Sequence, residues 1–176
     1  QKFLYKNGRI ISTCLCNKKR GRYYLPYTMK KITVCIIILN WNGIAYTKAC
    51  IQSLLKITKE TDKILVIDNG SQKNEASQLA KTFGTKIEIY RLSKNSGFTG
   101  GCNYGITQAQ KYHPEFYLLL NNDTDIRNDF LTPLIKTARK NKKIGIVSPV
   151  IYNLTNEGIN FSGGYIQWLF GKTYHK

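Results

Sequence analysis

Residues 117–126 read YLLLNNDTDI, and the rest of the chain is interpreted outward from this stretch. Its apolar run leads directly into two amides and two carboxylates, which is typical of a strand that is buried on both faces and ends in a polar turn. In an open α/β sheet such a turn is expected at the carboxyl edge, where ligands bind. Because closely spaced carboxylates repel one another unless a cation lies between them, the turn predicts a site for Mg²⁺ or Mn²⁺. The alternative is an Asn- and Asp-rich turn that caps the next helix, and the stretch by itself leaves both interpretations open.

Apolar periodicity on both sides of this stretch predicts strands that alternate with helices. The expected strands are 32–39, 63–67, 86–92, 116–120 and 144–147, and the expected helices are 45–56, 74–83, 102–111 and 128–141. Pro133 must lie in the first turn of the last helix or bend it. The helices have the length of βαβ crossovers, so the predicted fold class is α/β, with a mostly parallel sheet and helices on both faces.

Polar clusters follow the first four expected strands: 40–43 (NWNG), 68–71 (DNGS), 95–101 (NSGFTGG) and 121–125 (NNDTD). Right-handed crossovers bring the carboxyl ends of parallel strands to one edge of the sheet. The four clusters therefore predict a single site at that edge.

Several side chains in these clusters have the chemistry of nucleotide recognition. The ring of Trp41 can stack on a nucleobase, and Asp68 can accept a hydrogen bond from a base N–H or a ribose hydroxyl. The glycine-rich stretch 95–101, flanked by Asn95 and Asn103, precedes a helix whose N–H groups suit a phosphate or ribose. It matches neither G-x-G-x-x-G nor the P-loop, which disfavours a Rossmann dehydrogenase and a kinase. A Trp packed under its loop, an Asx turn and glycines that only permit tight turns are the alternatives.

The chain has 176 residues, enough for one domain, and a net charge of +17 that is distributed unevenly. Residues 1–31 hold nine Lys or Arg and no acidic residue, and the remainder has a net charge of +8. Such a surface attracts nucleic acid, anionic lipid or phosphorylated substrates without choosing among them. Residues 1–28 show no clear period, so we expect a basic extension outside the fold at 1–28 and the folded domain at 29–176.

Cysteine and histidine usage narrows the possible chemistry. The five cysteines are odd in number and form no C-x-x-C pair, which disfavours a disulfide framework and a zinc site and fits a reducing compartment. With two histidines, a histidine-based metal site or triad is not expected. No apolar run approaches the ~20 residues of a membrane span, so we expect a cytoplasmic protein. The basic cluster 139–143 suggests a peripheral contact with the cytoplasmic face of a membrane as a further hypothesis.

The order of these motifs resembles that of inverting family-two glycosyltransferases with the GT-A fold. Residues 32–43 (ITVCIIILNWNG) are similar to the first strand of the family, and 64–71 (ILVIDNGS) to its second-strand motif. Residues 95–106 (NSGFTGGCNYGI) are similar to its third segment, and 117–126 to the LLLN-x-D form of its DxD motif. The resemblance covers residues 30 to about 164, and the nearest subgroup is the rhamnosyltransferase-like enzymes of bacterial polysaccharide biosynthesis.

The resemblance implies a transferase that binds a nucleotide-diphosphate sugar, UDP- or dTDP-linked, and acts on a saccharide or lipid-linked acceptor. It implies that a divalent metal, Mg²⁺ or Mn²⁺, is bound by Asp123, with Asp125 as the second choice. It implies nucleotide-sugar contacts from Asn40, Trp41, Asn42, Asp68, Asn95, Gly97, Asn103, Asn121 and Asn122. Trp41 and Asp68 match the positions near the base, and Asn121 takes the place of the first DxD carboxylate.

The chain departs from the family in one respect. The family's catalytic base is an Asp or Glu in a later motif, which we expect beyond Lys176, because after Asp129 the only carboxylate side chain is Glu157. We therefore expect a donor-binding part with only the start of an acceptor region. The alternatives are a non-catalytic nucleotide-binding fragment and a basic nucleic-acid-binding protein. No RNA-binding signature is present, so no nucleic-acid partner is expected.

Overall fold

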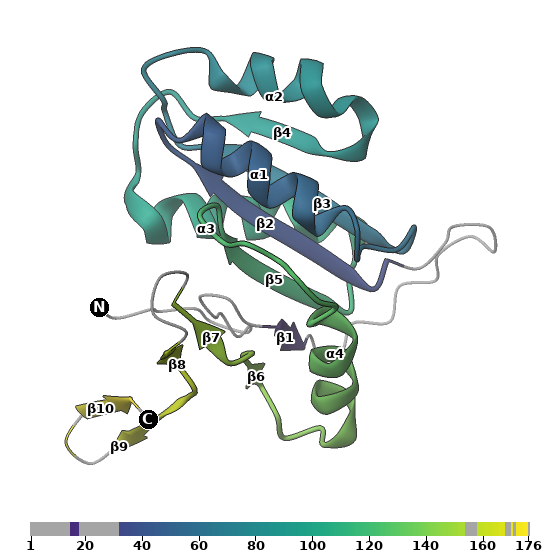
Figure 1. Cartoon of the computed structure of the whole chain (residues 1–176), viewed down its shortest axis with the longest axis vertical. Helices are drawn as coiled ribbons and strands as arrows, with labels where there is room; N and C mark the ends of the chain where they lie inside the picture. The colour runs from purple at the N-terminus through teal and green to yellow at the C-terminus, as the bar shows by residue number, and fades with distance from the viewer. Residues whose placement is uncertain (1–14, 18–31, 154–157, 168–169, 171, 176) are drawn as a thin grey trace.

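The structure is a computed structural model that describes residues 15–17, 32–153, 158–167, 170 and 172–175 (Figure 1). Its centre is a six-stranded sheet in the order β4-β3-β2-β5-β1-β6. Four strands are parallel: β2 (Val34–Asn40), β3 (Asp62–Asp68), β4 (Glu88–Arg91) and β5 (Phe116–Asn121). Beyond β5, β1 (Leu15–Asn17) pairs antiparallel with β5, and β6 (Ile146–Val147) pairs antiparallel with β1.

Helices cover both faces of this sheet, which confirms the predicted α/β class. One face packs against α1 (Ile44–Leu54), α2 (Glu75–Phe83) and α4 (Leu131–Lys140), and the other against α3 (Gly97–Ala109). Short 3-10 turns, Gly84–Lys86 and Gln110–Tyr112, follow α2 and α3. Among the helices in the described part of the chain, none is long and apolar enough to cross a membrane.

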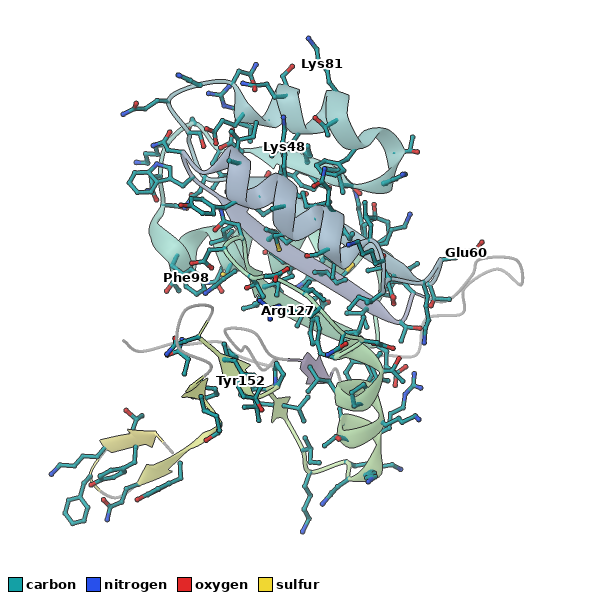
Figure 2. The ribbon with its side chains drawn as sticks, in the orientation of Figure 1. Lys48, Glu60, Lys81, Phe98, Arg127 and Tyr152 are labelled. Atoms are coloured by element: carbon teal, nitrogen blue, oxygen red, sulfur yellow. The ribbon has the colours of Figure 1, made fainter. Side chains whose placement is uncertain are left out.

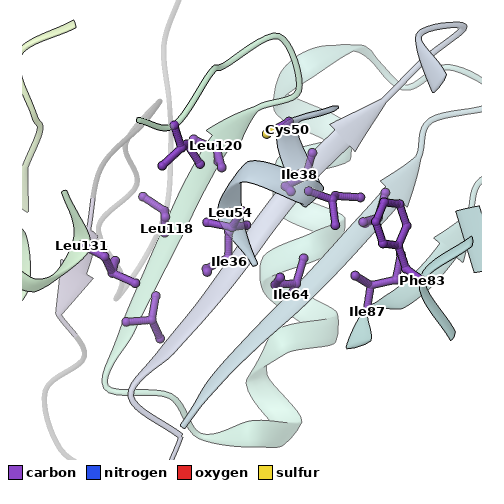
Figure 3. Packing of buried hydrophobic residues seen from close by; sticks show 14 of the residues in the cluster. Ile36, Ile38, Cys50, Leu54, Ile64, Phe83, Ile87, Leu118, Leu120 and Leu131 are labelled. Carbon is purple, nitrogen blue, oxygen red and sulfur yellow. The ribbon is translucent and has the colours of Figure 1, made fainter. Parts of the chain in front are cut away.

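The core follows from the alternation of side chains along the strands. In β2, Ile36 and Ile38 point to the face of α1, whereas Cys35 and Ile37 point to the face of α3. Figure 3 shows Ile36 and Ile38 packed between Leu54 of α1 and the neighbouring strands. The strand is buried on both faces, as its uninterrupted β-branched run predicts.

The third helix begins five residues earlier than predicted. The expected loop 95–101 becomes helical at Gly97, so all three of its glycines lie within α3. Packing requires a glycine at position 101, where a Cβ would lie 3.0 Å from Leu39, and at position 105 further along the helix, where a Cβ would lie 2.5 Å from Ile37. The glycines thus let the helix approach the sheet closely, and only Gly97, at φ +73°, has the backbone of a turn.

The two ends of the chain differ from the sequence-based expectation. Within the segment 1–28, expected to lie outside the fold, Leu15–Asn17 forms β1 and pairs with β5. The expectation is therefore not met for these three residues, and the rest of the segment lies outside the described residues. Towards the other end, where the periodicity fades, four short strands form two antiparallel pairs: β7 (Ile151–Tyr152) with β8 (Ile159–Phe161), and β9 (Gly164–Gln167) with β10 (Lys172–His175).

Candidate functional site

The four predicted polar clusters meet at the carboxyl edge of the parallel strands. In the sheet register, Asn40 lies opposite Asp68, and Asp68 lies opposite Arg91. Backbone hydrogen bonds continue the pairing past the strand ends, from Asn69 N to Asn40 O (2.8 Å) and from Leu92 N to Asp68 O (2.8 Å). Figure 2 shows Phe98, in the first turn of α3, at this edge and Glu60, before β3, at the opposite edge.

Asn40 is the centre of a buried hydrogen-bond network at this edge. Its side chain is 0% exposed. Its Nδ2 donates to Glu75 Oε2 (2.8 Å) and Ser71 Oγ (3.3 Å) and lies 3.5 Å from Asp68 Oδ1. Its Oδ1 accepts from Thr47 Oγ1 (2.7 Å). Asn40, predicted to contact the nucleotide, is thus enclosed by protein and holds the surrounding loops together.

The loop after β2 is fixed to the loop before α2 by three further hydrogen bonds. Asn42 N donates to Ser71 Oγ (2.9 Å), Gly43 N donates to Glu75 Oε2 (3.2 Å), and Gln72 N donates to Asn42 Oδ1 (2.9 Å). Asn42 has a φ of +51°, a left-handed conformation that Asn tolerates well. Between these anchors Trp41 is 56% exposed, so its ring is not packed beneath the loop.

Asp68 is also 0% exposed and lies behind Arg91. Its Oδ1 accepts from Ser71 N (3.2 Å). Its Oδ2 has no hydrogen-bond partner and lies 3.5 Å from Arg91 Nε, in an ion pair. Arg91 Nη2 in turn donates to Ser71 O (3.0 Å). A ligand could reach the Asp68 carboxylate only if the Arg91 side chain moved aside.

Asn69 joins the second cluster to the third. Its Nδ2 donates to Asn95 Oδ1 (3.0 Å) and Gly97 O (3.1 Å), and its Oδ1 accepts from the backbone N–H and the hydroxyl of Ser96. Asn95 and Gly97 are exposed. Asn103, further along α3, has a buried Oδ1 without a hydrogen-bond partner. In the described residues, this atom and Asp68 Oδ2 are the buried side-chain oxygens and nitrogens that lack one.

The fourth cluster carries the predicted metal ligands. Asn121, Asp123 and Asp125 are exposed, while Asn122 turns inward and its Nδ2 donates to Thr47 Oγ1 (2.9 Å). Asp125 Oδ2 pairs with Arg127 Nε (3.1 Å). Asp123 has no hydrogen-bond or ion-pair partner within the described part of the chain.

This set of oxygen donors fits a metal that is shared with a phosphorylated ligand. The described residues contain no group of three or more His, Cys, Asp or Glu that could hold a metal ion by themselves. Mg²⁺ and similar hard cations are commonly bound by one or two carboxylates together with substrate phosphates. Asp123, with Asp125 two residues away, provides carboxylates of that kind at the exposed rim of the edge.

The buried cysteines do not provide nucleophiles. Burial raises the pKa of Cys35, Cys50 and Cys102 to about 12, so the thiolate form is negligible at neutral pH.

A cavity of about 210 Å³ lies at the opposite, amino edge of the sheet, among residues that include Thr33, Asp62 and Thr132. It is therefore separate from the four clusters.

Sequence reasoning missed Thr47, Glu75 and Arg91 as parts of the site, and it included Ser71 in the cluster 68–71 without giving it a role. Arg91 was recognisable as the cation that ends an expected strand beside Asp68. Glu75 gave no such signal, because a carboxylate in the first turn of a helix is an ordinary partner of the helix dipole. Its hydrogen-bond partner in β2 lies 35 residues away.

The fold and its loop-lined edge define an α/β domain of the GT-A type. The solved structure of S. aureus TarS 1–349 has this fold, with a TM-score of 0.53 and 23% identity over 62% of this chain and 33% of that chain. The sequence profile of Glycosyl transferase family 2 matches residues 35–174, and the chain belongs to this family.

Curated relatives agree with the family. The chain is 34% identical over 99 residues to an uncharacterized glycosyltransferase of Rickettsia conorii, covering 56% of this chain and 16% of that protein. It is 34% identical over 91 residues to an uncharacterized glycosyltransferase of Rickettsia felis, covering 51% of this chain and 14% of that protein. The chain thus spans less than a fifth of the length of these relatives.

Proposed function

We propose that the carboxyl edge binds a nucleotide-diphosphate sugar, with UDP or dTDP as the nucleotide, for transfer of the sugar with inversion to a saccharide or lipid-linked acceptor. The observation that carries the proposal is that two buried oxygens, Asp68 Oδ2 and Asn103 Oδ1, accept no hydrogen bond, although Asp68 Oδ2 is in an ion pair with Arg91. Both belong to residues whose motif positions imply nucleotide contacts. Buried acceptors without a hydrogen bond are costly, and a base N–H or a ribose hydroxyl would supply one.

The proposed roles follow the order of the loops along the edge. Trp41 is exposed and stacks on the base. Asp68 accepts from the base once Arg91 has moved, and Asn103 accepts from the ribose. Asn95, just before α3, donates to the nucleotide through its side-chain N–H groups. Gly97, whose backbone N–H donates to Asn95 Oδ1 (2.7 Å), orients that side chain beside the nucleotide.

The exposed turn after β5 is the proposed binding site of the diphosphate. Asp123 is the proposed metal ligand and Asp125 the second, with Asn121 beside them as a neutral oxygen donor. A bound Mg²⁺ or Mn²⁺ would neutralise charge that develops on the departing nucleotide diphosphate. The acceptor hydroxyl must lose its proton to a general base, and the proposal assigns this role to none of the described residues.

Contact with a membrane surface is a further part of the proposal. The last turn of α4 contains Arg139 and Lys140, and Lys142 and Lys143 follow. Arg139 is already paired with Glu115 through two hydrogen bonds, of 2.9 Å and 2.6 Å, which weakens its attraction for lipid. Co-sedimentation with vesicles should increase with their content of anionic lipid, and binding that is independent of that content would refute the contact.

Titration calorimetry tests the donor site directly. UDP and dTDP are titrated into the full chain with Mn²⁺ or with EDTA, and into the variants Asp123→Ala and Asp125→Ala. We expect metal-dependent binding that Asp123→Ala weakens at least about 30-fold and Asp125→Ala weakens less, since each lost contact to a charged group is worth about 2 kcal/mol. The matched control Glu60→Ala, at the opposite edge, should bind as the wild type does. Absence of binding to the folded wild type would refute the proposal.

A further inference from the structure

The carboxylate of Glu75 is buried against the loop that carries Trp41. Glu75 is the first residue of α2 and is 7% exposed. Its Oε2 accepts two hydrogen bonds from across the edge, from Asn40 Nδ2 (2.8 Å) and from Gly43 N (3.2 Å). These donors lie on both sides of Trp41, so one carboxylate oxygen fixes both ends of the loop.

The electrostatic setting of Glu75 is unusual for a structural residue. Both donors are neutral, and no Lys or Arg pairs with Glu75 in the part of the chain that the structure describes. A buried carboxylate is costly unless it is compensated, and here only amide donors and the N-terminus of α2 compensate it. A hydrophobic side chain could be buried at this position with a smaller desolvation penalty. The carboxylate therefore indicates a role in ordering the loops of the carboxyl edge and not in global stability.

The same network extends to the turn that carries Asp123. Asn122 Nδ2 donates to Thr47 Oγ1 (2.9 Å), and Thr47 Oγ1 donates to Asn40 Oδ1 (2.7 Å). The other end of the Asn40 amide donates to Glu75. A continuous chain of hydrogen bonds therefore joins α2, the Trp41 loop and the turn after β5.

We propose that Glu75 is a positioning residue that holds the Trp41 loop and the Asp123 turn in fixed relative positions for a nucleotide diphosphate. The inference rests on the proposed function, in which Trp41 stacks on the base and Asp123 binds the metal. Glu75 touches neither base nor metal in this scheme and acts through Asn40 and Gly43. Such a residue affects affinity because it removes the entropy cost of ordering the loop upon binding.

A double-mutant cycle separates this role from a general contribution to folding. Glu75→Gln keeps the volume but replaces the charged acceptor by a neutral carbonyl oxygen, which accepts more weakly from Asn40 and Gly43. Calorimetric titration of UDP with Mn²⁺ into the full chain should show about tenfold weaker binding for Glu75→Gln. In the double variant with Trp41→Ala, the loss of binding free energy should be smaller than the sum of the two single losses, because Glu75→Gln acts through the position of Trp41. Additive losses would overturn the proposal.

Glu88→Gln is the matched control. Like Glu75, Glu88 is a carboxylate that accepts several hydrogen bonds, in its case from the side chains of Lys111, Tyr90 and Tyr112. It lies at the start of β4, and therefore at the amino edge of the sheet. The control should leave UDP affinity unchanged and should not couple to Trp41→Ala. An equal loss of affinity in the Glu75 and Glu88 variants would mean that any lost carboxylate weakens binding, and this would overturn the proposal.

Amide hydrogen exchange tests the positioning without any nucleotide. In Glu75→Gln, and also in Glu75→Asp, whose side chain is one methylene shorter, the Gly43 amide should exchange at least about tenfold faster than in the wild type. Amides in the middle of β2 should remain as protected as in the wild type, which shows that the variants fold. Unchanged protection of Gly43 would overturn the proposal even if UDP binds. If the wild type binds no nucleotide, the proposed function fails, while the exchange data still decide whether Glu75 holds the loop.

Discussion

Glu75 at the carboxyl edge of the sheet has different electrostatic surroundings from Glu88 and Glu115 at the amino edge. At the carboxyl edge, Glu75 is buried and accepts from an Asn side chain and a backbone N–H, while Asp68 is fully enclosed. At the amino edge, Glu88 pairs with Lys111 and Glu115 pairs with Arg139, in each case with a half-exposed cation. At the carboxyl edge, Glu75 thus relies on neutral donors and the enclosed Asp68 on an ion pair with Arg91. The two carboxylates at the amino edge rely on ion pairs in contact with solvent.

This difference has an energetic meaning. Solvent-exposed ion pairs contribute about 0–1 kcal/mol each, whereas removing one partner from a buried charged network costs about 3–5 kcal/mol. A fold under selection for stability alone has little reason to bury carboxylates where its loops converge. The contrast therefore supports the proposal that the carboxyl edge binds a ligand.

The largest predicted effect is that of Asn40→Leu, at the carboxyl edge. Leu is branched in the same way as Asn, although bulkier, and it removes the donor to Glu75 and the acceptor for Thr47, so that a buried carboxylate loses its main partner. We expect a loss of about 4 kcal/mol in the free energy of unfolding, measured by urea denaturation. A loss below about 1 kcal/mol would mean that the network is no more important than a surface ion pair.

A smaller loss of stability is expected when alanine replaces either of two glycines that have the same backbone conformation but different neighbours. Gly70 has a φ of +74° and Gly97 a φ of +73°, but a Cβ on Gly70 would lie 2.5 Å from the backbone of Lys94, and one on Gly97 would meet nothing within 4 Å. Gly97→Ala should cost only the left-handed strain, about 1 kcal/mol. Gly70→Ala should cost about 3 kcal/mol because it also forces the second and third loops apart. Equal losses in urea denaturation would show that contact between these loops does not stabilise the edge.

The sequence predicted the parallel sheet and the convergence of the four clusters because both depend on local pattern and on chain topology. The uninterrupted apolar run at 34–39 identifies a buried strand, and a polar residue must follow where it ends. The start of α3 was missed because glycine is read as a loop former, while here it permits close packing of a helix against Ile37 and Leu39.

The chemistry of individual site residues was less predictable. Asn40 was expected at the nucleotide, yet its amide is enclosed because Thr47 and Glu75 reach it from two helices. Local pattern cannot reveal a hydrogen bond between residues 35 positions apart. For the same reason, the sequence placed Glu75 only within the expected helix 74–83 and gave it no role in the site.

At the amino edge, Arg139→Gln should have little effect. The guanidinium makes two hydrogen bonds to Glu115 and lies over the ring of Phe116, 5.9 Å from its centroid, but about half of the Arg139 side chain is exposed. We expect a loss below about 1 kcal/mol in the free energy of unfolding, reduced further by salt. A loss as large as that of Asn40→Leu would remove the distinction between the edges.

The smallest predicted effect is a dependence on pH at Glu88. Burial alone would raise its pKa, but hydrogen bonds from Lys111, Tyr112 and Tyr90 outweigh burial and hold the pKa of Glu88 below its ordinary value of 4.5. Since the folded-state pKa is lowered, the contribution to stability is fully present above the ordinary value and is lost as the pH falls through the folded-state value. Glu88→Gln lacks this titration.

Urea denaturation of the wild type and of Glu88→Gln at about pH 7 and about pH 3.5 measures the effect. The wild type should be the more stable protein at the higher pH, by less than about 1 kcal/mol, and the difference should shrink at the lower pH. A difference that stays constant with pH would mean that Glu88 acts through packing and not through its charge. Glu88 is in contact with solvent, so neutralising its side chain should cost little stability. The enclosed Glu75 has little such contact, so neutralising it should cost more.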